Sequence, residues 1–375
     1  MSSQSANPPS PPVRDLCILR LSALGDVCNL VPSVRALQEA HPDIRITWVI
    51  GAAEYSLLKG LEGVDFVIYN KKTGFKGMRD LGRQLKQKQQ GKPFDVLLHM
   101  QAALRASILS RFIPARRRIG FDKARAKDFQ NWFVNEQIVA NPQQHVGEGF
   151  LDFVRYLGVQ PQSLQWNLPI PVEAEEEAAT WQPEQHPYLV LSPCSSNRAR
   201  NWRNWSTAGY AALVDYAYEH YGLRTLVTGG NSELEHQTFA ELEQLASAPL
   251  VKAVGQTSLK ALLCLIRDAR LVVAPDSGPI HMAVAMQTPP LGLYATSNPK
   301  RTGPWLGREF VANRYPEAVK KFLGKEVEEI GWGQRVRDPA ALDLITLDDV
   351  KERLDAIMAA SPDCLKEQKE RLDEN

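Results

Sequence analysis

Two short polar segments, far apart in the chain, combine side chains that can act on a phosphate-bearing ligand. The first contains Asp26, and the second is residues 276–281, with the sequence DSGPIH. Each follows an apolar, β-branched run and precedes a stretch with helical periodicity, which predicts two strand–turn–helix units. In an open α/β sheet, ligands bind beyond the carboxyl ends of strands, where helix N-termini present free N–H groups to an anion. The sequence therefore predicts a carboxylate base facing a phosphate-bearing ligand.

Asp26 fits two roles. A carboxylate beside a helix N-terminus stays ionised and can accept a proton from an incoming hydroxyl, a step worth about 10²–10⁴ in rate. An aspartate at this position is also a common N-cap residue of the helix that follows. The spacing alone favours neither role.

The second segment also has two interpretations. Gly278 lets the backbone approach a ligand closely, Ser277 supplies a hydroxyl, and His281 lies one turn further on. Pro279 stands near a helix start, where its missing N–H costs nothing. The alternative is a plain turn followed by a histidine that only packs.

Two more predicted strands end in polar loops. After the first strand of the second half, Ser195 and Ser196 precede Arg200, whose guanidinium matches phosphate oxygens. An exposed basic loop is the alternative. In the next such loop, Glu233 either accepts hydrogen bonds from a ribose or a base, or caps its helix.

Several common motifs are absent from the sequence. It contains no G-x-G-x-x-G after the first strand, no P-loop, no G-x-S-x-G and no H-x-x-x-H. These absences disfavour hydride transfer and ATP hydrolysis, so we expect an anion site built from basic side chains and helix ends. The five cysteines form no C-x-x-C pair, which argues for a reducing cytoplasm and against a zinc site. We expect no cofactor and no metal.

Strands and helices alternate in both halves of the sequence, which predicts an α/β protein with parallel sheets. In the first half we predict strands at 16–20, 45–50, 65–69 and 95–99, with helices at 29–41, 54–60, 78–90 and 103–111. In the second half we predict strands at 188–192, 225–230, 251–254, 271–274 and 290–294, with helices at 205–221, 232–245, 258–267, 279–286 and 347–359. The domains expected are a disordered tail (1–14), an α/β domain (15–171), a Pro- and Glu-rich linker (172–187), a second α/β domain (188–346), and a C-terminal helix and tail (347–375).

The length and composition agree with two soluble domains. The chain has 375 residues, of which 44% are hydrophobic and 23% charged, and no apolar run approaches a membrane span. Its N-terminus lacks the features of a secretory signal. Residues 1–171 carry a net charge of +8 and residues 172–375 one of −7, and the segment 71–127 alone holds 16 basic and three acidic residues. This excess predicts a polyanion or an anionic membrane as partner, with a set of solvated helix faces as the alternative.

Taken together, the segments resemble glycosyltransferase family 9, the ADP-heptose:lipopolysaccharide heptosyltransferases, and most of all the heptosyltransferase I type. The resemblance spans about residues 15–304. Its carriers are RLSALGDV (20–27), ITWVI (46–50), LHMQAALRAS (98–107), GFDKAR (120–125), GQTSL (255–259) and DSGPIH (276–281).

The resemblance implies a GT-B fold, with two Rossmann-like parallel-sheet domains facing a central cleft. Asp26 then matches the catalytic base. The positions that match donor-binding ones are Ser195, Ser196, Arg200, Glu233, Thr257, Asp276, Ser277, Gly278 and His281. At Arg200-Asn201-Trp202 the chain departs from the Lys-His-Trp often found there, and Arg keeps the charge but not the geometry. Candidate acceptor-binding residues in the first domain are Gln101, Arg105, Arg118, Lys123 and Arg125.

The implied reaction is an inverting, metal-independent transfer of L-glycero-D-manno-heptose from ADP-heptose to a Kdo hydroxyl of Kdo-lipid A. The resemblance also implies a cytoplasmic enzyme peripheral to the inner membrane, without a nucleic-acid partner, and the oligomeric state stays open. Alternatives of the same class are a later-acting heptosyltransferase or another nucleotide-sugar transferase. Alternatives of other classes are a nucleotide-sugar 2-epimerase and a non-catalytic envelope-associated binding protein.

Overall fold

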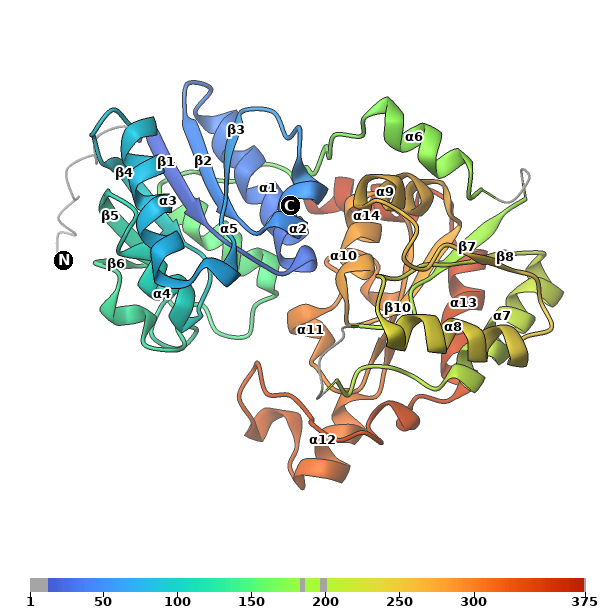
Figure 1. Ribbon diagram of the computed structural model, residues 1–375. Coiled ribbons are helices and arrows are strands. Elements are labelled where there is room, and N and C mark those ends of the chain that lie inside the picture. Colours follow the sequence, from blue (N-terminus) through green and yellow to red (C-terminus); the bar gives the residue numbers. More distant parts are fainter. Residues whose placement is uncertain (1–12, 183–185, 196–200, 374–375) are drawn as a thin grey trace.

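The computed structural model describes residues 13–182, 186–195 and 201–373. Most of the predicted N-terminal tail and the predicted donor residues Ser196 and Arg200 lie outside the described residues. The described chain forms two lobes, each built on a parallel sheet (Figure 1). This arrangement confirms the predicted α/β class.

Both sheets have six strands in the same doubly wound order. The first runs β3-β2-β1-β4-β5-β6 and the second β12-β11-β10-β7-β8-β9, and every pairing within them is parallel. The strands of the first sheet are β1 (Asp15–Leu19), β2 (Arg45–Ile50), β3 (Val64–Ile68), β4 (Phe94–His99), β5 (Ala115–Gly120) and β6 (Glu136–Gln137). Those of the second are β7 (Tyr188–Leu191), β8 (Arg224–Val227), β9 (Leu250–Lys252), β10 (Leu271–Pro275), β11 (Pro290–Tyr294) and β12 (Ala312–Asn313). The strand order reverses between β1 and β4 in one sheet and between β7 and β10 in the other, which is where ligands bind in such sheets.

Helices cover both faces of each sheet. In the first lobe they are α1 (Leu24–Ala40), α2 (Ala52–Leu58), α3 (Gly74–Lys88), α4 (Leu104–Ser110) and α5 (Val146–Tyr156). The side chains of β1 alternate between the two faces, so that Leu16 and Ile18 join a core with α1 and α5, while Cys17 and Leu19 join one with α3 and α4. The remaining helices are α6 (Val172–Ala179), α7 (Thr207–Tyr221), α8 (Glu233–Leu245), α9 (Leu259–Asp268), α10 (Gly278–Ala285), α11 (Pro299–Thr302), α12 (Tyr315–Leu323), α13 (Leu347–Ala359) and α14 (Cys364–Asp373). Among the described residues, no helix combines the length and apolarity that crossing a bilayer requires.

The nine predicted strands overlap β1–β4 and β7–β11, but the structure adds elements that we did not predict. These are the strands β5, β6 and β12 and the helices α5, α6, α11, α12 and α14. β5 escaped prediction because three consecutive arginines interrupt its apolar pattern. The segment 172–187, predicted as a linker, contains α6, which packs on α9 and is held there by an ion pair between Glu175 and Arg267.

The two lobes meet along α1 and α10, in the middle of Figure 1. Further contacts join them: His145 Nε2 lies 3.0 Å from the Gly303 carbonyl, and Trp332 Nε1 donates to the Gln144 carbonyl at 2.7 Å. The last helix, α14, returns to the first lobe, where the Asp373 carboxylate accepts a hydrogen bond from the Leu164 amide. The lobes are therefore packed directly against each other.

Candidate functional site

The predicted site residues come from loops that follow the strands next to the two reversal points. Asp26 follows β1 and Gln101 follows β4, while Ser195 follows β7 and the Asp276 turn follows β10. Parallel strands point their carboxyl ends to one edge of a sheet, so each lobe gathers its pair of loops at a single edge. The sequence position of these residues relative to their strands was therefore predicted correctly.

Glycines allow the first turns of α1 and α10 to touch across the lobes. A Cβ atom at Gly25 would overlap the His281 ring, and one at Gly278 would lie 3.3 Å from Leu24 Cβ. Asp26 is the next residue after Gly25. The structure thus brings the first predicted segment against the second, although they are 250 positions apart.

Asp26 is paired with Arg20 at the end of β1. The Arg20 guanidinium forms an ion pair with Oδ2, and the Ala23 amide donates to the same oxygen at 3.1 Å. The N-cap of α1 is Ala23, so the alternative that Asp26 is the N-cap is wrong. Asp26 is the third residue of the helix, and its carboxylate accepts the hydrogen bond from the Ala23 amide. No described residue is hydrogen-bonded to Oδ1, and the side chain is 32% exposed. One carboxylate oxygen is therefore held in place while the other is available to a ligand.

The charges around Asp26 keep it ionised. Burial raises the pKa of its carboxyl. The positive charge of Arg20 and the hydrogen bond from the Ala23 amide lower that pKa by more than burial raises it, so that it lies below its ordinary value. Arg20 is itself fixed, because it donates to the Met100 carbonyl at 2.6 Å and its guanidinium lies over the Phe150 ring. Asp26 is thus a positioned base that stays charged at neutral pH.

His281 is neutral and oriented. Burial lowers the pKa of its ring, and the carboxylates of Asp276 and Asp26 offset this only in part. Asn29 Nδ2 lies 3.2 Å from the His281 Nδ1 atom. An amide nitrogen only donates, so Nδ1 accepts and the ring proton is on Nε2.

On the second lobe, Asp276 is buried and is held by several partners. Its Oδ2 accepts from Ser297 Oγ at 2.7 Å, and Arg203 NH1 donates to its carbonyl at 2.6 Å. Arg335 NH2 lies 4.0 Å from the same carboxylate. The neighbouring Ser277 is the N-cap of α10, yet its Oγ is buried and has no hydrogen-bond partner among the described residues. Asp276 therefore shapes the turn, whereas Ser277 has an unused hydroxyl at the helix N-terminus.

The other predicted donor residues lie in neighbouring loops. Ser195 is half-buried and donates through Oγ to Asn201 Oδ1 at 2.8 Å, and Thr257 is half-buried just before α9. Glu233 is exposed in the first turn of α8 and accepts from Gln237. It is not the residue that caps α8, because Ser232 and Glu235 form that capping box.

Gln101 and Arg105, predicted as acceptor-binding residues, lie beside the Asp26 loop. Gln101 Oε1 accepts from the Leu21 amide at 2.6 Å and so fixes the backbone just before Asp26. Lys71 Nζ donates to Ser22 Oγ at 3.2 Å, and Arg105 NH1 donates to the Lys71 carbonyl at 3.4 Å. These contacts place two cations at the first-lobe side of the site.

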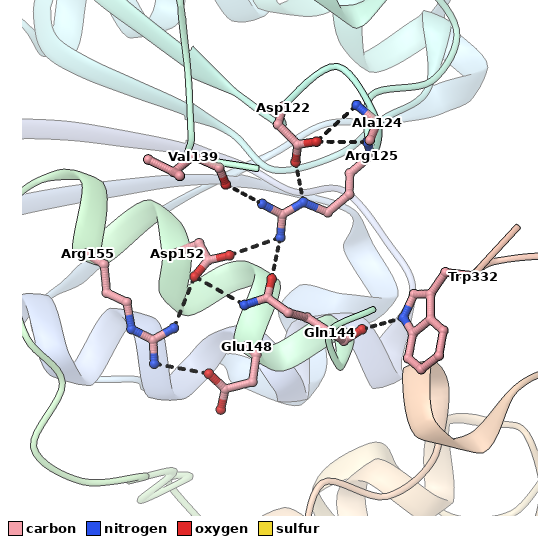
Figure 2. A network of polar contacts seen from close by, with 9 residues as sticks. All are labelled: Asp122, Ala124, Arg125, Val139, Gln144, Glu148, Asp152, Arg155 and Trp332. Carbon is pink, nitrogen blue, oxygen red and sulfur yellow. Dashed lines mark hydrogen bonds and ion pairs between the residues drawn. The ribbon is translucent and has the colours of Figure 1, made fainter. Parts of the chain in front are cut away.

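Arg118 and Arg125 have other roles in the structure. Arg118 donates to the carbonyls of Ser110 and Ile113 at the end of α4. Lys123 is exposed in the loop after β5. The guanidinium of Arg125 is already surrounded by partners, which Figure 2 shows: Asp122, Val139, Gln144 and Asp152. Because its donors are in use, Arg125 stabilises the first lobe and does not point a free charge at an acceptor.

The structure also reveals a cation that sequence analysis missed. Arg301, on α11, is half-buried, and a Cβ at Gly333 would come within 3.3 Å of its Nε. No carboxylate pairs with its guanidinium within the described part of the chain. Burial lowers the pKa of Arg301, while Asp26 and Asp276 raise it, so the guanidinium lies within electrostatic reach of both carboxylates. The signal was present in the sequence, since Asn298-Pro299 after a strand is typical of a helix start.

The described residues contain no cluster of three or more His, Cys, Asp or Glu arranged to hold a metal ion. Within the described part of the chain, the arrangement consists of the ionised Asp26 carboxylate from one lobe, a helix N-terminus from the other lobe whose capping hydroxyl has no partner, and the Arg301 guanidinium, which forms no ion pair. Such a set of groups suits removal of a proton from a hydroxyl and stabilisation of an anionic leaving group.

Comparison with known proteins gives a consistent result. The family model described as glycosyltransferase family 9 (heptosyltransferase) matches residues 78–328. The lipopolysaccharide core heptosyltransferase OpsX of Haemophilus influenzae is 37% identical over 324 residues, which cover 86% of this chain and 91% of that protein.

Solved structures of similar fold have lower identity. A family 9 glycosyltransferase from Veillonella parvula has a TM-score of 0.75 and 20% identity, over 93% of this chain and 98% of that one. The Escherichia coli heptosyltransferase WaaC with ADP has a TM-score of 0.69 and 18% identity, over 91% and 99%. At these identities the likeness concerns the fold.

Proposed function

This chain belongs to glycosyltransferase family 9, with the GT-B fold, and we propose that it transfers L-glycero-D-manno-heptose from ADP-heptose to a Kdo hydroxyl of Kdo-lipid A. The name of its 37%-identical relative supports a role in the lipopolysaccharide core. The first lobe then holds the acceptor and the second lobe the donor.

Asp26 acts as the general base. Its Oδ1 accepts the proton of the Kdo hydroxyl, while Arg20 and the Ala23 amide hold Oδ2. The hydroxyl oxygen attacks the anomeric carbon of the heptose from the face opposite ADP, so the anomeric configuration inverts. The bond from that carbon to the diphosphate oxygen breaks, and its electron pair leaves with ADP.

The second lobe stabilises the charge that develops on the diphosphate. The free N–H groups at the start of α10 and the Ser277 hydroxyl donate hydrogen bonds to it, and Arg301 supplies a positive charge. Arg200, outside the described residues, is a further cation for this role. No metal takes part in this proposal.

The observation that carries the proposal is the contact between the first turns of α1 and α10. It brings the helix turn that carries the ionised Asp26 against the first turn of α10, where the Ser277 hydroxyl has no hydrogen-bond partner among the described residues. Attack on a sugar diphosphate requires a base and an anion site in neighbouring positions.

The decisive experiment is incubation with ADP-heptose, with EDTA present, and three acceptors in parallel: none, Kdo-lipid A, and Kdo-lipid A that already carries one heptose. We expect ADP release and a heptosylated product only with unmodified Kdo-lipid A. Transfer only to the heptosylated acceptor would indicate a later-acting heptosyltransferase. Conversion of the sugar nucleotide without acceptor would indicate an epimerase. The absence of any turnover would indicate a binding protein.

We further infer that the enzyme works in the cytoplasm, at the inner face of the inner membrane, where its lipid acceptor would be presented. The net charge of +8 on residues 1–171 supports this, since lipid A and inner-membrane lipids are anionic.

A further inference from the structure

Two aromatic side chains of the first lobe are exposed and pack against each other with their rings tilted. Phe129 is 62% exposed and Trp132 is 79% exposed, and their ring centroids lie 5.0 Å apart. Phe129 and Asp128 before it have φ values of 60° and 52°, in the left-handed region that non-glycine residues avoid. The chain therefore adopts a costly backbone conformation that leaves both rings in solvent.

The loop that carries these rings is firmly anchored. Gln130, between them, is fully buried; its Nε2 donates to the His99 carbonyl at 2.9 Å and its Oε1 accepts from the Phe121 amide at 3.2 Å. The outward position of Phe129 and Trp132 is thus fixed by the fold, and is not the result of a loose loop.

A series of contacts links this pair to other exposed apolar residues. The amide of Leu104, a residue that is 46% exposed, donates to Asp128 Oδ2 at 3.3 Å. Next to it, Arg105 reaches the Lys71 carbonyl at 3.4 Å. Lys71 opens the short helix that leads into Phe75, which is 63% exposed and packs edge-on against Phe112.

The charged residues of this region are mostly positive. We define the basic-aromatic face by its exposed members: Lys71, Lys72, Phe75, Lys76, Leu104, Arg105, Lys123, Lys127, Phe129 and Trp132. The one carboxylate in the contacts just described, Asp128, is used by the Leu104 amide. Aromatic rings flanked by cations match the boundary between anionic headgroups and acyl chains.

The basic-aromatic face borders the catalytic loop. Lys71 Nζ contacts Ser22 Oγ at 3.2 Å, and Ser22 lies four residues before Asp26. Anything bound to this face is therefore close to the proposed base.

We propose that the basic-aromatic face docks on an anionic lipid bilayer, with the rings of Phe129 and Trp132 inserted at the headgroup level. This deepens the proposed function, on which it rests, because a lipid-anchored acceptor then reaches Asp26 from the surface on which the enzyme sits. The lysines and arginine contact the headgroups, and binding weakens as salt screens them.

The test is sedimentation of the whole protein with vesicles of phosphatidylethanolamine and phosphatidylglycerol, and separately with phosphatidylcholine vesicles, without donor or acceptor. We expect binding to the anionic vesicles only. The double variant Phe129→Ser/Trp132→Ser should lose at least about tenfold in partition coefficient, and the double variant Lys72→Glu/Lys76→Glu should lose as much. Tyr218→Ser and Lys325→Glu, exposed residues of the second lobe, serve as matched controls and should bind like the wild type.

The same variants are assayed for transfer to a deacylated, water-soluble acceptor, which we expect them to retain. Equal vesicle binding by the aromatic variant and the wild type would overturn the proposal, as would equal wild-type binding to both kinds of vesicle. Unchanged vesicle binding with lost transfer to the soluble acceptor would also overturn it, since the rings would then contact the sugar. Because sedimentation needs no turnover, failure of the proposed reaction leaves this result interpretable.

Discussion

Asn29 and His281, which are 252 positions apart in the chain, share a buried hydrogen bond of 3.2 Å across the two lobes. The bond joins the first helix of one lobe to the helix whose N-terminus we assign to the diphosphate. It also fixes which nitrogen of His281 carries the proton. This contact therefore contributes both to the geometry of the site and to the cohesion of the lobes.

Replacing Asn29 with Ala should destabilise the protein. The change leaves the buried His281 Nδ1 without a donor, which costs about 1–3 kcal/mol, and we expect a lower denaturation temperature by calorimetry. Ser33→Ala is the matched control on the same helix, since the Ser33 hydroxyl is buried and has no partner among the described residues. Equal denaturation temperatures of the Asn29 variant and the wild type would contradict the expectation.

Replacing Asp26 with Asn should lower kcat at least about a hundredfold, because the amide cannot accept the proton of the acceptor hydroxyl. ADP binding, measured by titration calorimetry, should change little, since the donor contacts lie on the second lobe. The exposed Asp43→Asn variant controls for loss of a negative charge from the same lobe. Near-normal transfer by Asp26→Asn would remove this residue from the mechanism.

Replacing Arg20 with Met should shift the pH dependence of the reaction. In the native protein the pKa of Asp26 lies below its ordinary 3.8, so kcat/KM should not decline until the solution is strongly acidic. Without Arg20, burial continues to raise that pKa and its main opposing charge is gone, so the acidic decline should move to higher pH. Initial rates measured across the pH range test this, and an unchanged profile would argue against the ion pair as the cause.

Replacing Arg301 with Gln should lower kcat/KM at least about tenfold, because one group that stabilises the charge of the transition state is lost. Lys300→Gln is the control, because this exposed lysine precedes Arg301 on the same short helix. Equal effects of the two substitutions would indicate a general electrostatic influence of α11 and no specific role for Arg301.

The sequence was sufficient to predict the parts of the fold that have a local signal. Apolar strands followed by polar turns and periodic helices predicted nine strands, and Asp26 and Asp276 were found because each follows such a strand directly. β5 was missed because consecutive arginines are typical of an exposed surface. In the structure, the Arg117 NH2 atom lies 2.7 Å from Glu136 Oε2 on the neighbouring strand, and this ion pair neutralises its charge. Pairing of this kind is visible only once the sheet is assembled.

Roles that depend on distant partners could not be predicted in the same way. Arg125 was expected to meet the acceptor, but it is paired both with the nearby Asp122 and with Asp152, which lies 27 positions further on. Arg301 was overlooked for the opposite reason. The absence of a carboxylate partner for it among the described residues, and the influence of Asp26 on its pKa, follow from how the lobes pack. The charge of a side chain can be read from the sequence, but whether that charge is free to bind a ligand depends on which residues the fold brings beside it.

The contact of Gly25 with His281 is one of the places where the two lobes approach each other most closely, because a hydrogen atom stands there in place of a side chain. The Cβ atom of a Gly25→Ala variant would overlap the His281 ring and so force the two lobes apart. This substitution would alter the separation of the lobes without replacing any charged group of the active site.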